Sequence, residues 1–188
     1  LPPIAEALLA AGFETFYKSE KGKRSFFDLQ TKKYVPYPED PKSVRLPALK
    51  EADRVLAHND GATLIDMGDG VLCCEFHTKM NAVDDEIMNM MNQGLDLLEK
   101  DDKWVGMVLG NHGENFCAGA NVFLLLMGAQ QGAWDQVEAS VKKFQDVCMR
   151  LKYSPKPVVA APFAMTLGGG AEISMGARPS RPTIRRRW

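Results

Sequence analysis

The sequence predicts an α/β fold, in which buried strands alternate with amphipathic helices. Apolar residues recur at steps of three and four over 84–100 and again over 134–151, which predicts two helices. Short apolar runs at 71–76, 105–109 and 158–161 lie between and around these helices, which predicts strands. We therefore expect a sheet covered by helices.

The first fifty residues predict a small separate unit. We expect a short apolar helix over 3–11 and two strands over 14–17 and 25–29, with a turn at 20–22. Four prolines then predict a linker without regular structure over 34–47. These prolines are Pro36, Pro38, Pro41 and Pro47.

A hairpin and a polar loop precede the first long helix. Strands over 63–65 and 71–76 flank a turn at 66–70, which contains two glycines. Residues 77–81 are polar and form the expected loop into helix 84–100. Near the end of the chain, a further helix-compatible run covers 173–177.

The composition and charge of the chain indicate which classes of binding partner to expect. Of the 188 residues, 45% are hydrophobic and 25% charged, as in ordinary globular proteins, and no apolar run approaches the ~20 residues that span a bilayer. Five of the nine arginines lie in 178–188, so the other residues carry 18 basic and 24 acidic side chains, a net of −6. We expect neither nucleic acid nor a membrane as partner. The basic tail is interpreted as a solvated end, with an arm for an anionic partner as the alternative.

The cysteines and histidines do not form a metal-binding pattern. None of the four cysteines forms a C-x-x-C pair, and the three histidines are scattered. We expect no metal, and buried or half-buried free thiols in a reducing compartment, which favours a cytoplasmic protein. The cysteines are Cys73, Cys74, Cys117 and Cys148.

Two stretches of small residues are the candidate functional loops. Residues 115–121 follow the strand that ends at Leu109, and 166–172 follow the strand that ends at Ala161. Three glycines at 168–170 leave bare N–H groups at an expected helix start, where developing negative charge is stabilised. Taken alone, a triple glycine is more often a tight turn, and Glu172 is equally compatible with an exposed first-turn residue.

Taken together, these motifs resemble one family. Phe116-Cys117-Ala118-Gly119-Ala120-Asn121, then Lys156-Pro157-Val158-Val159-Ala160-Ala161, then Leu167-Gly168-Gly169-Gly170-Ala171-Glu172 resemble the enoyl-CoA hydratase (crotonase) superfamily. Residues 79–83 are similar to the first substrate loop of that family. The resemblance covers roughly 62–177 and implies a crotonase-like ββα spiral, present here as an incomplete domain, the N-terminal half.

The resemblance implies a site for acyl-CoA thioesters. The backbone N–H groups of Ala120 and Gly169 would polarise the thioester carbonyl, where charge develops as an enolate. Glu172 matches the first of two glutamates that family hydratases use around one water. The remaining substrate-binding residues that the resemblance implies are Thr78, Met80, Ala82, Ala118, Asn121 and Gly168.

The sequence departs from the family pattern at its end. The second family glutamate lies about twenty residues after the first, whereas the sixteen residues after Glu172 contain no acid. We expect 178–188 to be a basic tail foreign to the fold. Asn121 stands where many members have Asp, and we assign it no catalytic role.

A second resemblance concerns the first unit. Residues 11–17 and 22–28 resemble the end of a 3-hydroxyacyl-CoA dehydrogenase unit, which some bacterial bifunctional β-oxidation proteins place before the hydratase. The expected organisation is 1–51 as the tail of that unit with its proline-rich linker, 52–177 as the acyl-CoA-binding domain, and 178–188 as the tail. NAD would belong to a dehydrogenase domain upstream, and the hydratase half needs no cofactor.

Three functional hypotheses follow. The first is an enoyl-CoA hydratase module of a bifunctional 3-hydroxyacyl-CoA dehydrogenase/enoyl-CoA hydratase. The second is a Δ3,Δ2-enoyl-CoA isomerase, which commonly relies on the second acidic position, so the presence of Glu172 favours the hydratase. The third is a catalytically inactive fold fragment or assembly module. Turnover by this chain is expected to be negligible, and any homo-oligomer would form through parts not present.

Overall fold

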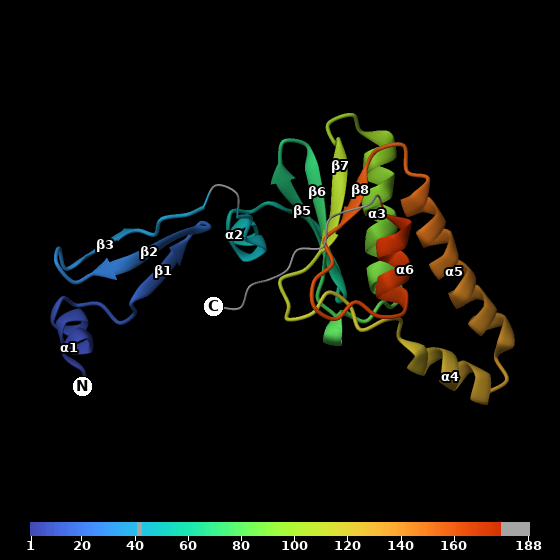
Figure 1. Ribbon diagram of the computed structural model, residues 1–188, viewed down its shortest axis with the longest axis horizontal. Helices are drawn as coiled ribbons and strands as arrows, with labels where there is room; N and C mark the ends of the chain where they lie inside the picture. Colours follow the sequence, from blue (N-terminus) through green and yellow to red (C-terminus); the bar gives the residue numbers. More distant parts are fainter. Residues whose placement is uncertain (41–42, 178–188) are drawn as a thin grey trace. The chain divides into compact units, whose positions relative to one another are not determined.

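The computed structural model describes residues 1–40 and 43–177, and the expected basic tail 178–188 lies outside this range. The chain forms two compact units, Leu1–Arg54 and Val55–Trp188 (Figure 1). In the described part, the alternation of strands and helices confirms the predicted α/β class.

The first unit is a small antiparallel sheet with two short helices. Phe27 is buried and packs against Phe13 and Tyr34, with ring centroids 5.5 and 6.2 Å apart. The sheet order is β1-β2-β3, and Phe26 of β2 pairs with Val35 of β3. The elements are α1 (Pro3–Ala10), β1 (Tyr17–Glu20), β2 (Lys23–Asp28), β3 (Lys33–Pro36) and α2 (Leu46–Glu51).

The expected linker over 34–47 is wrong at both ends. β3 occupies its start, because Pro36 closes an outer strand, where a missing N–H costs no ladder bond. Helix α2 occupies its end, because Pro47 lies in the first turn, where no N–H is required. The first strand also begins at Tyr17 rather than residue 14, and the hairpin turn follows its last residue at Lys21 and Gly22, both with positive φ.

The second unit is a five-stranded mixed sheet with the order β4-β5-β6-β7-β8. The pairs β4–β5 and β5–β6 are antiparallel, whereas β6–β7 and β7–β8 are parallel. The strands are β4 (Val55–His58), β5 (Ala62–Gly68), β6 (Val71–Phe76), β7 (Gly106–Gly110) and β8 (Val158–Ala160). The predicted strands therefore exist, with shifted ends, and β4 is an additional edge strand.

Helices form further layers on one face of this sheet (Figure 1). Helix α3 packs on β5, β6 and β7, α6 packs on β8, and α5 packs on both α3 and α6. The helical elements are η1 (Lys79–Asn81), α3 (Asp85–Lys100), α4 (Val122–Gln130), α5 (Trp134–Lys152) and α6 (Gly169–Gly176). Helix α4 was not expected: its run of apolar residues has no amphipathic period that would reveal a helix.

The structure of helix α3 shows why the apolar pattern was sufficient to predict this helix. Asp84 caps its start by accepting a hydrogen bond from the Ile87 N–H at 3.0 Å. Ile87, Met91 and Leu95 form a buried stripe against the sheet. Gly94 permits the close approach, because a Cβ there would lie 2.6 Å from Sδ of Met107 on β7.

The predicted burial of the cysteines is confirmed: Cys73, Cys74 and Cys117 are buried and Cys148 is half-buried, and none of them forms a disulfide in the described part of the chain. Within residues 1–40 and 43–177, no helix has the length and apolar character needed to cross a membrane.

Candidate active site

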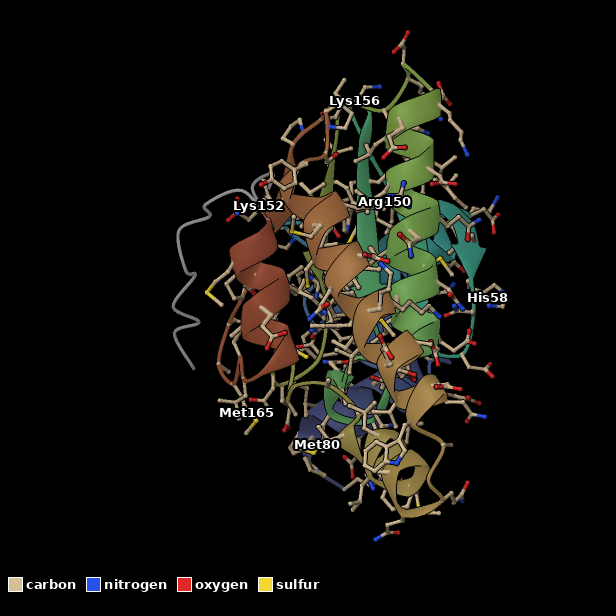
Figure 2. The ribbon with its side chains drawn as sticks, turned by 90° about the vertical axis from the view of Figure 1, so that its right-hand side faces the viewer. His58, Met80, Arg150, Lys152, Lys156 and Met165 are labelled. Atoms are coloured by element: carbon tan, nitrogen blue, oxygen red, sulfur yellow. The ribbon has the colours of Figure 1, made fainter. Side chains whose placement is uncertain are left out.

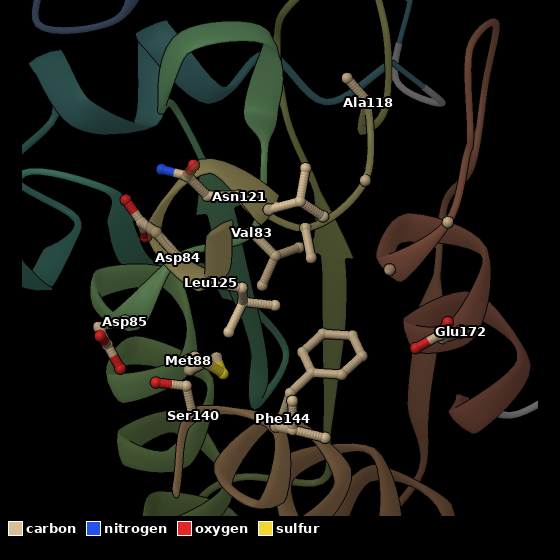
Figure 3. A pocket seen from close by; sticks show the side chains of 16 residues that line it. Val83, Asp84, Asp85, Met88, Ala118, Asn121, Leu125, Ser140, Phe144 and Glu172 are labelled. Carbon is tan, nitrogen blue, oxygen red and sulfur yellow. The ribbon is translucent and has the colours of Figure 1, made fainter. Parts of the chain in front are cut away.

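A pocket of about 420 Å³ lies in the second unit, between the start of α3, helices α4 and α5, and the loop before α6 (Figure 3). Six residues predicted for the site line it together. These are Ala118, Ala120, Asn121, Gly168, Gly169 and Glu172. The two candidate loops therefore meet at one cavity, although almost fifty residues separate them along the chain.

The first loop is fixed against the segment before α3. The Ala118 N–H donates to the Met80 carbonyl at 3.2 Å, and the Val83 N–H donates to the Gly119 carbonyl at 2.8 Å. The Asn121 N–H donates a hydrogen bond to the Val83 carbonyl at 2.9 Å. These bonds form a short parallel bridge between Val83 and Ala120, so that the intervening backbone has a defined direction.

The same loop is fixed on its other side against the second loop. The Cys117 N–H donates to the Met165 carbonyl at 3.1 Å, and the Leu167 N–H donates to the Cys117 carbonyl at 3.0 Å. A parallel bridge joins Cys117 to Thr166. Residues 117–121 thus bridge the segment before α3 and the segment before α6.

This arrangement brings two main-chain N–H groups to one wall of the pocket. A Cβ added to Gly169 would lie 3.1 Å from the Ala120 nitrogen. Among the described residues, no acceptor takes a hydrogen bond from the N–H of Ala120 or of Gly169. The preceding residues, Gly119 and Gly168, have φ values of +116° and +43°, which favour glycine. Two donors without internal partners therefore stand side by side.

Glu172 lies in the first turn of α6, where its N–H donates to the Gly168 carbonyl at 3.0 Å. Its side chain is exposed and points into the pocket (Figure 3). Burial, and secondarily the negative charge of Glu172, raise the pKa of the Cys148 thiol to about 11. The carboxylate is thus electrostatically coupled to helix α5 as well as facing the cavity.

The rest of the pocket wall is largely apolar and, apart from Val83 in the expected first substrate loop, was not predicted. Its side chains come from α3, α4, α5 and the residues before α3; among them are Val83, Met88, Leu125, Val141 and Phe144. Two of these, Val141 and Phe144, belong to the apolar stripe that predicted helix 134–151. The helical period of these residues therefore predicted a helix face packed in a core rather than the wall of a cavity. Acidic Asp84 and Asp85 and the hydroxyl of Ser140 also line the pocket.

Of the expected first substrate loop, residues 79–83, Val83 lines the pocket, whereas Met80, Ala82 and the preceding Thr78 do not. Thr78 holds this loop by donating from Oγ1 to the Ala82 carbonyl at 2.7 Å. Met80 has a φ of +57° and a 57% exposed side chain, and Ala82 is half-buried. Thr78, Met80 and Ala82 thus flank the site through the backbone bond from Ala118, and the structure does not bring their side chains into the cavity. Across the described residues, no group of His, Cys, Asp and Glu is arranged to hold a metal.

Solved structures identify the fold class. An enoyl-CoA hydratase/isomerase from Xanthobacter autotrophicus Py2 superposes with a TM-score of 0.56 and 23% identity, over 64% of this chain and 45% of that one. A carnitinyl-CoA dehydratase from Mycobacterium thermoresistibile gives a TM-score of 0.57 and 19% identity, over 67% and 37%. These likenesses show a crotonase-like fold, which the sequence motifs had predicted.

The family follows from the sequence itself. Residues 70–181 match the profile of the enoyl-CoA hydratase/isomerase family, and this is more than half of the chain. The chain belongs to that family, as its motifs indicated.

Two relatives extend the comparison to longer proteins. A Bacillus subtilis (strain 168) protein named "Probable 3-hydroxyacyl-CoA dehydrogenase" is 44% identical over 94% of this chain and 22% of its own length. A Rickettsia felis protein described as a fatty acid oxidation complex trifunctional enzyme is 29% identical over 65% of this chain and 17% of its own. The chain therefore spans about a fifth of the length of these relatives.

Proposed function

We propose that the second unit forms the thioester-binding part of an enoyl-CoA hydratase acting in fatty-acid β-oxidation. One observation carries the proposal: the N–H groups of Ala120 and Gly169 lie side by side on a pocket and have no acceptor among the described residues. In an enclosed apolar site, two such donors stabilise an oxyanion, and losing one typically costs ~10²–10³ in rate.

The chemistry assigns a role to Glu172. Its carboxylate accepts a proton from a water molecule while the water oxygen bonds to C3 of the enoyl-CoA. The electron pair of the 2,3 double bond moves toward the thioester oxygen, giving an enolate held by the two N–H groups. A proton must then reach C2. The resemblance to the family implies that its second glutamate supplies this proton, and no acid follows Glu172 in this sequence.

Binding of a thioester tests the proposal without requiring turnover. Acetoacetyl-CoA should bind the chain in a calorimetric titration more tightly than free CoA, because free CoA lacks the thioester carbonyl that the two N–H groups would bind. Its carbonyl stretch should move to lower frequency on binding. Equal affinity for the two ligands, or an unshifted carbonyl, would contradict the assignment of Ala120 and Gly169.

The isomerase is the second candidate. It would use the same two N–H groups but move a proton between C4 and C2 without adding water. The position of Glu172 on the pocket favours the hydratase, because it matches the first family glutamate. Assays of one preparation with a 2-enoyl-CoA and with a 3-enoyl-CoA distinguish the hydratase from the isomerase. Migration of the double bond without addition of water would refute the hydratase.

We expect turnover by the 188-residue chain to be negligible, which near-native hydratase activity would contradict.

The same proposal includes the first unit of the chain, the cofactor and the cellular compartment. The match of a dehydrogenase-named relative over 94% of this chain supports assigning the first unit to the end of a dehydrogenase. NAD would then bind a domain outside this sequence, and the hydratase half would use no metal or redox cofactor. Four cysteines that form no disulfide among the described residues are compatible with the reducing environment of the cytoplasm.

A further inference from the structure

One buried side chain contacts both loops that present the candidate N–H donors. The Gly119 N–H donates to Sγ of Cys117 at 3.3 Å, and the thiol lies 3.4 Å from the Gly119 carbonyl oxygen. A Cβ on Gly170 would lie 2.5 Å from Cβ and 2.8 Å from Sγ of Cys117. The thiol is thus lodged between the residue before Ala120 and the residue after Gly169.

We propose that Cys117 is a positioning residue, whose thiol sets the spacing and direction of the Ala120 and Gly169 N–H groups toward the thioester oxygen. This inference rests on the function proposed above. Cys117 does not line the pocket, so it acts through its neighbours rather than on substrate.

The main chain of Cys117 makes the same connection. It donates to Met165 and accepts from Leu167, both in the segment that leads to Gly169. Its side chain then contacts both the N–H and the carbonyl oxygen of Gly119, where φ is +116°. The same carbonyl accepts a hydrogen bond from the Val83 N–H at 2.8 Å, so the thiol and Val83 together hold the peptide plane between Gly119 and Ala120. A small rotation of that plane redirects the following N–H, which belongs to Ala120. Together with the bond from Val83, the thiol therefore restricts a rotation to which the direction of the Ala120 N–H is sensitive.

The thiol has the right chemistry for this position. Cys117 is completely buried, and burial raises the pKa of its thiol, so it stays protonated at neutral pH. A neutral thiol is both a weak donor and a weak acceptor, which matches its two contacts with Gly119. Gly170 has no side chain and accommodates the large sulfur atom at close range.

Three variants of the 188-residue chain test the role: Cys117→Ala, Cys117→Ser and the control Cys74→Ala. Cys74 is equally buried, but it lies in β6 and does not line the pocket. The readout is the frequency shift of the acetoacetyl-CoA carbonyl on binding, recorded with affinity and thermal stability. A merely structural role would change stability without changing the shift of bound ligand.

We expect Cys117→Ala to lose more than half of the carbonyl shift, Cys117→Ser to give an intermediate shift, and Cys74→Ala to keep the full shift. Serine is intermediate because its hydroxyl bonds Gly119 but reaches less far than sulfur. A full shift in the alanine variant overturns the proposal. If the alanine variant does not fold, a serine variant with the native shift overturns it. No shift in the unmodified chain would instead refute the oxyanion site itself, and this inference with it.

Discussion

The main-chain nitrogen of Ala120 lies 3.1 Å from the position that a Cβ on Gly169 would occupy. Such a distance is shorter than most contacts between a Cβ and a neighbouring backbone atom, so a methyl group there would push the neighbouring segment away by a few tenths of an ångström. Cζ of Phe144, on α5, would lie 3.2 Å from the same Cβ. Two other segments thus pack closely against residue 169, and the following prediction uses that crowding.

Replacing Gly169 by alanine should separate ligand recognition from folding. The added methyl group displaces the Ala120 N–H, and acetoacetyl-CoA should bind about tenfold more weakly, as for loss of one net hydrogen bond of about 1–1.5 kcal/mol. The free energy of unfolding should change by no more than about 1 kcal/mol, because alanine is the better helix former and partly offsets the crowding. Calorimetric titration and urea denaturation measure the two effects.

Gly110→Ala is the matched control for this substitution. A Cβ at Gly110 would meet only the Cβ of Ala161 at 3.9 Å, an ordinary contact, and Gly110 does not line the pocket. Its affinity for acetoacetyl-CoA should match that of the unmodified chain. Equal affinities for the Gly169 variant and the Gly110 variant would contradict a donor role for the Ala120 N–H.

Asn81 should be more sensitive to alanine than to glycine. Its side chain is buried and donates from Nδ2 to the Asn115 carbonyl at 2.9 Å, and its φ is +53°. Both substitutions remove the hydrogen bond, but only alanine adds the left-handed backbone penalty of about 1–2 kcal/mol. In urea denaturation, Asn81→Ala should therefore be less stable than Asn81→Gly by about 1 kcal/mol. The reverse order would show that side-chain packing, rather than backbone conformation, determines stability there.

Arg150 joins α5 to α3 through three side chains (Figure 2). Its guanidinium donates to Asn92 at 2.7 Å, to Asp96 at 2.8 Å and to Glu99 at 3.0 Å. Arg150→Met should reduce the free energy of unfolding at neutral pH by about 1 kcal/mol, since Asp96 and Glu99 are partly exposed and water screens their attraction. Thermal or urea denaturation measures the difference.

The effect of Arg150→Met should depend on pH in one direction. Hydrogen bonds from Lys100 and from Arg150 lower the pKa of Asp96 below its usual value in the folded state. The resulting stabilisation is present above the unfolded pKa of about 4 and is lost as pH falls through the lowered folded value. The gap between variant and unmodified chain should therefore narrow below about pH 4. Lys152→Met, at an exposed position of α5, should give no such gap, and a gap that widens in acid would contradict the assignment.

The sequence predicted the candidate loops better than the pocket they form. Ala118, Ala120 and Glu172 could be located because small residues and a carboxylate occur in an order that one family shares. The apolar wall could not, because Val141 and Phe144 follow the same helical period as core residues. Whether such a stripe meets a core or a cavity depends on a neighbouring helix, here α4, whose uniformly apolar sequence gave no period.

Errors in the first unit have a related origin. Proline was interpreted as breaking regular structure everywhere in 34–47, but its effect depends on whether the missing N–H would have had a partner. At Pro36, on an outer strand, and at Pro47, in a first helical turn, it would not. Strand order and helix starts decide that question, and both are set by tertiary contacts.

Removing the charge of Glu172 should change the titration of Cys148. The pKa of this thiol is raised to about 11, first by burial and then by the carboxylate of Glu172, whose negative charge disfavours the thiolate. In Glu172→Gln the pKa of Cys148 should fall, but it should stay above the ordinary value of about 8.5 because the burial is unchanged. The pH dependence of Cys148 alkylation, followed by mass spectrometry of its peptide, measures the pKa.

The control for this titration is Glu138→Gln, which removes an exposed carboxylate from α5 itself. Glu138 lies ten residues before Cys148, roughly 15 Å along the helix axis, where salt screens most of its influence. Its removal should leave the alkylation profile unchanged.

Bound acetoacetyl-CoA should raise the pKa of Cys148 further. Glu172 faces both Cys148 and the pocket, so a ligand that excludes water leaves less solvent to screen the carboxylate. An identical profile for the Glu172 variant and the unmodified chain would mean that this carboxylate points away from α5.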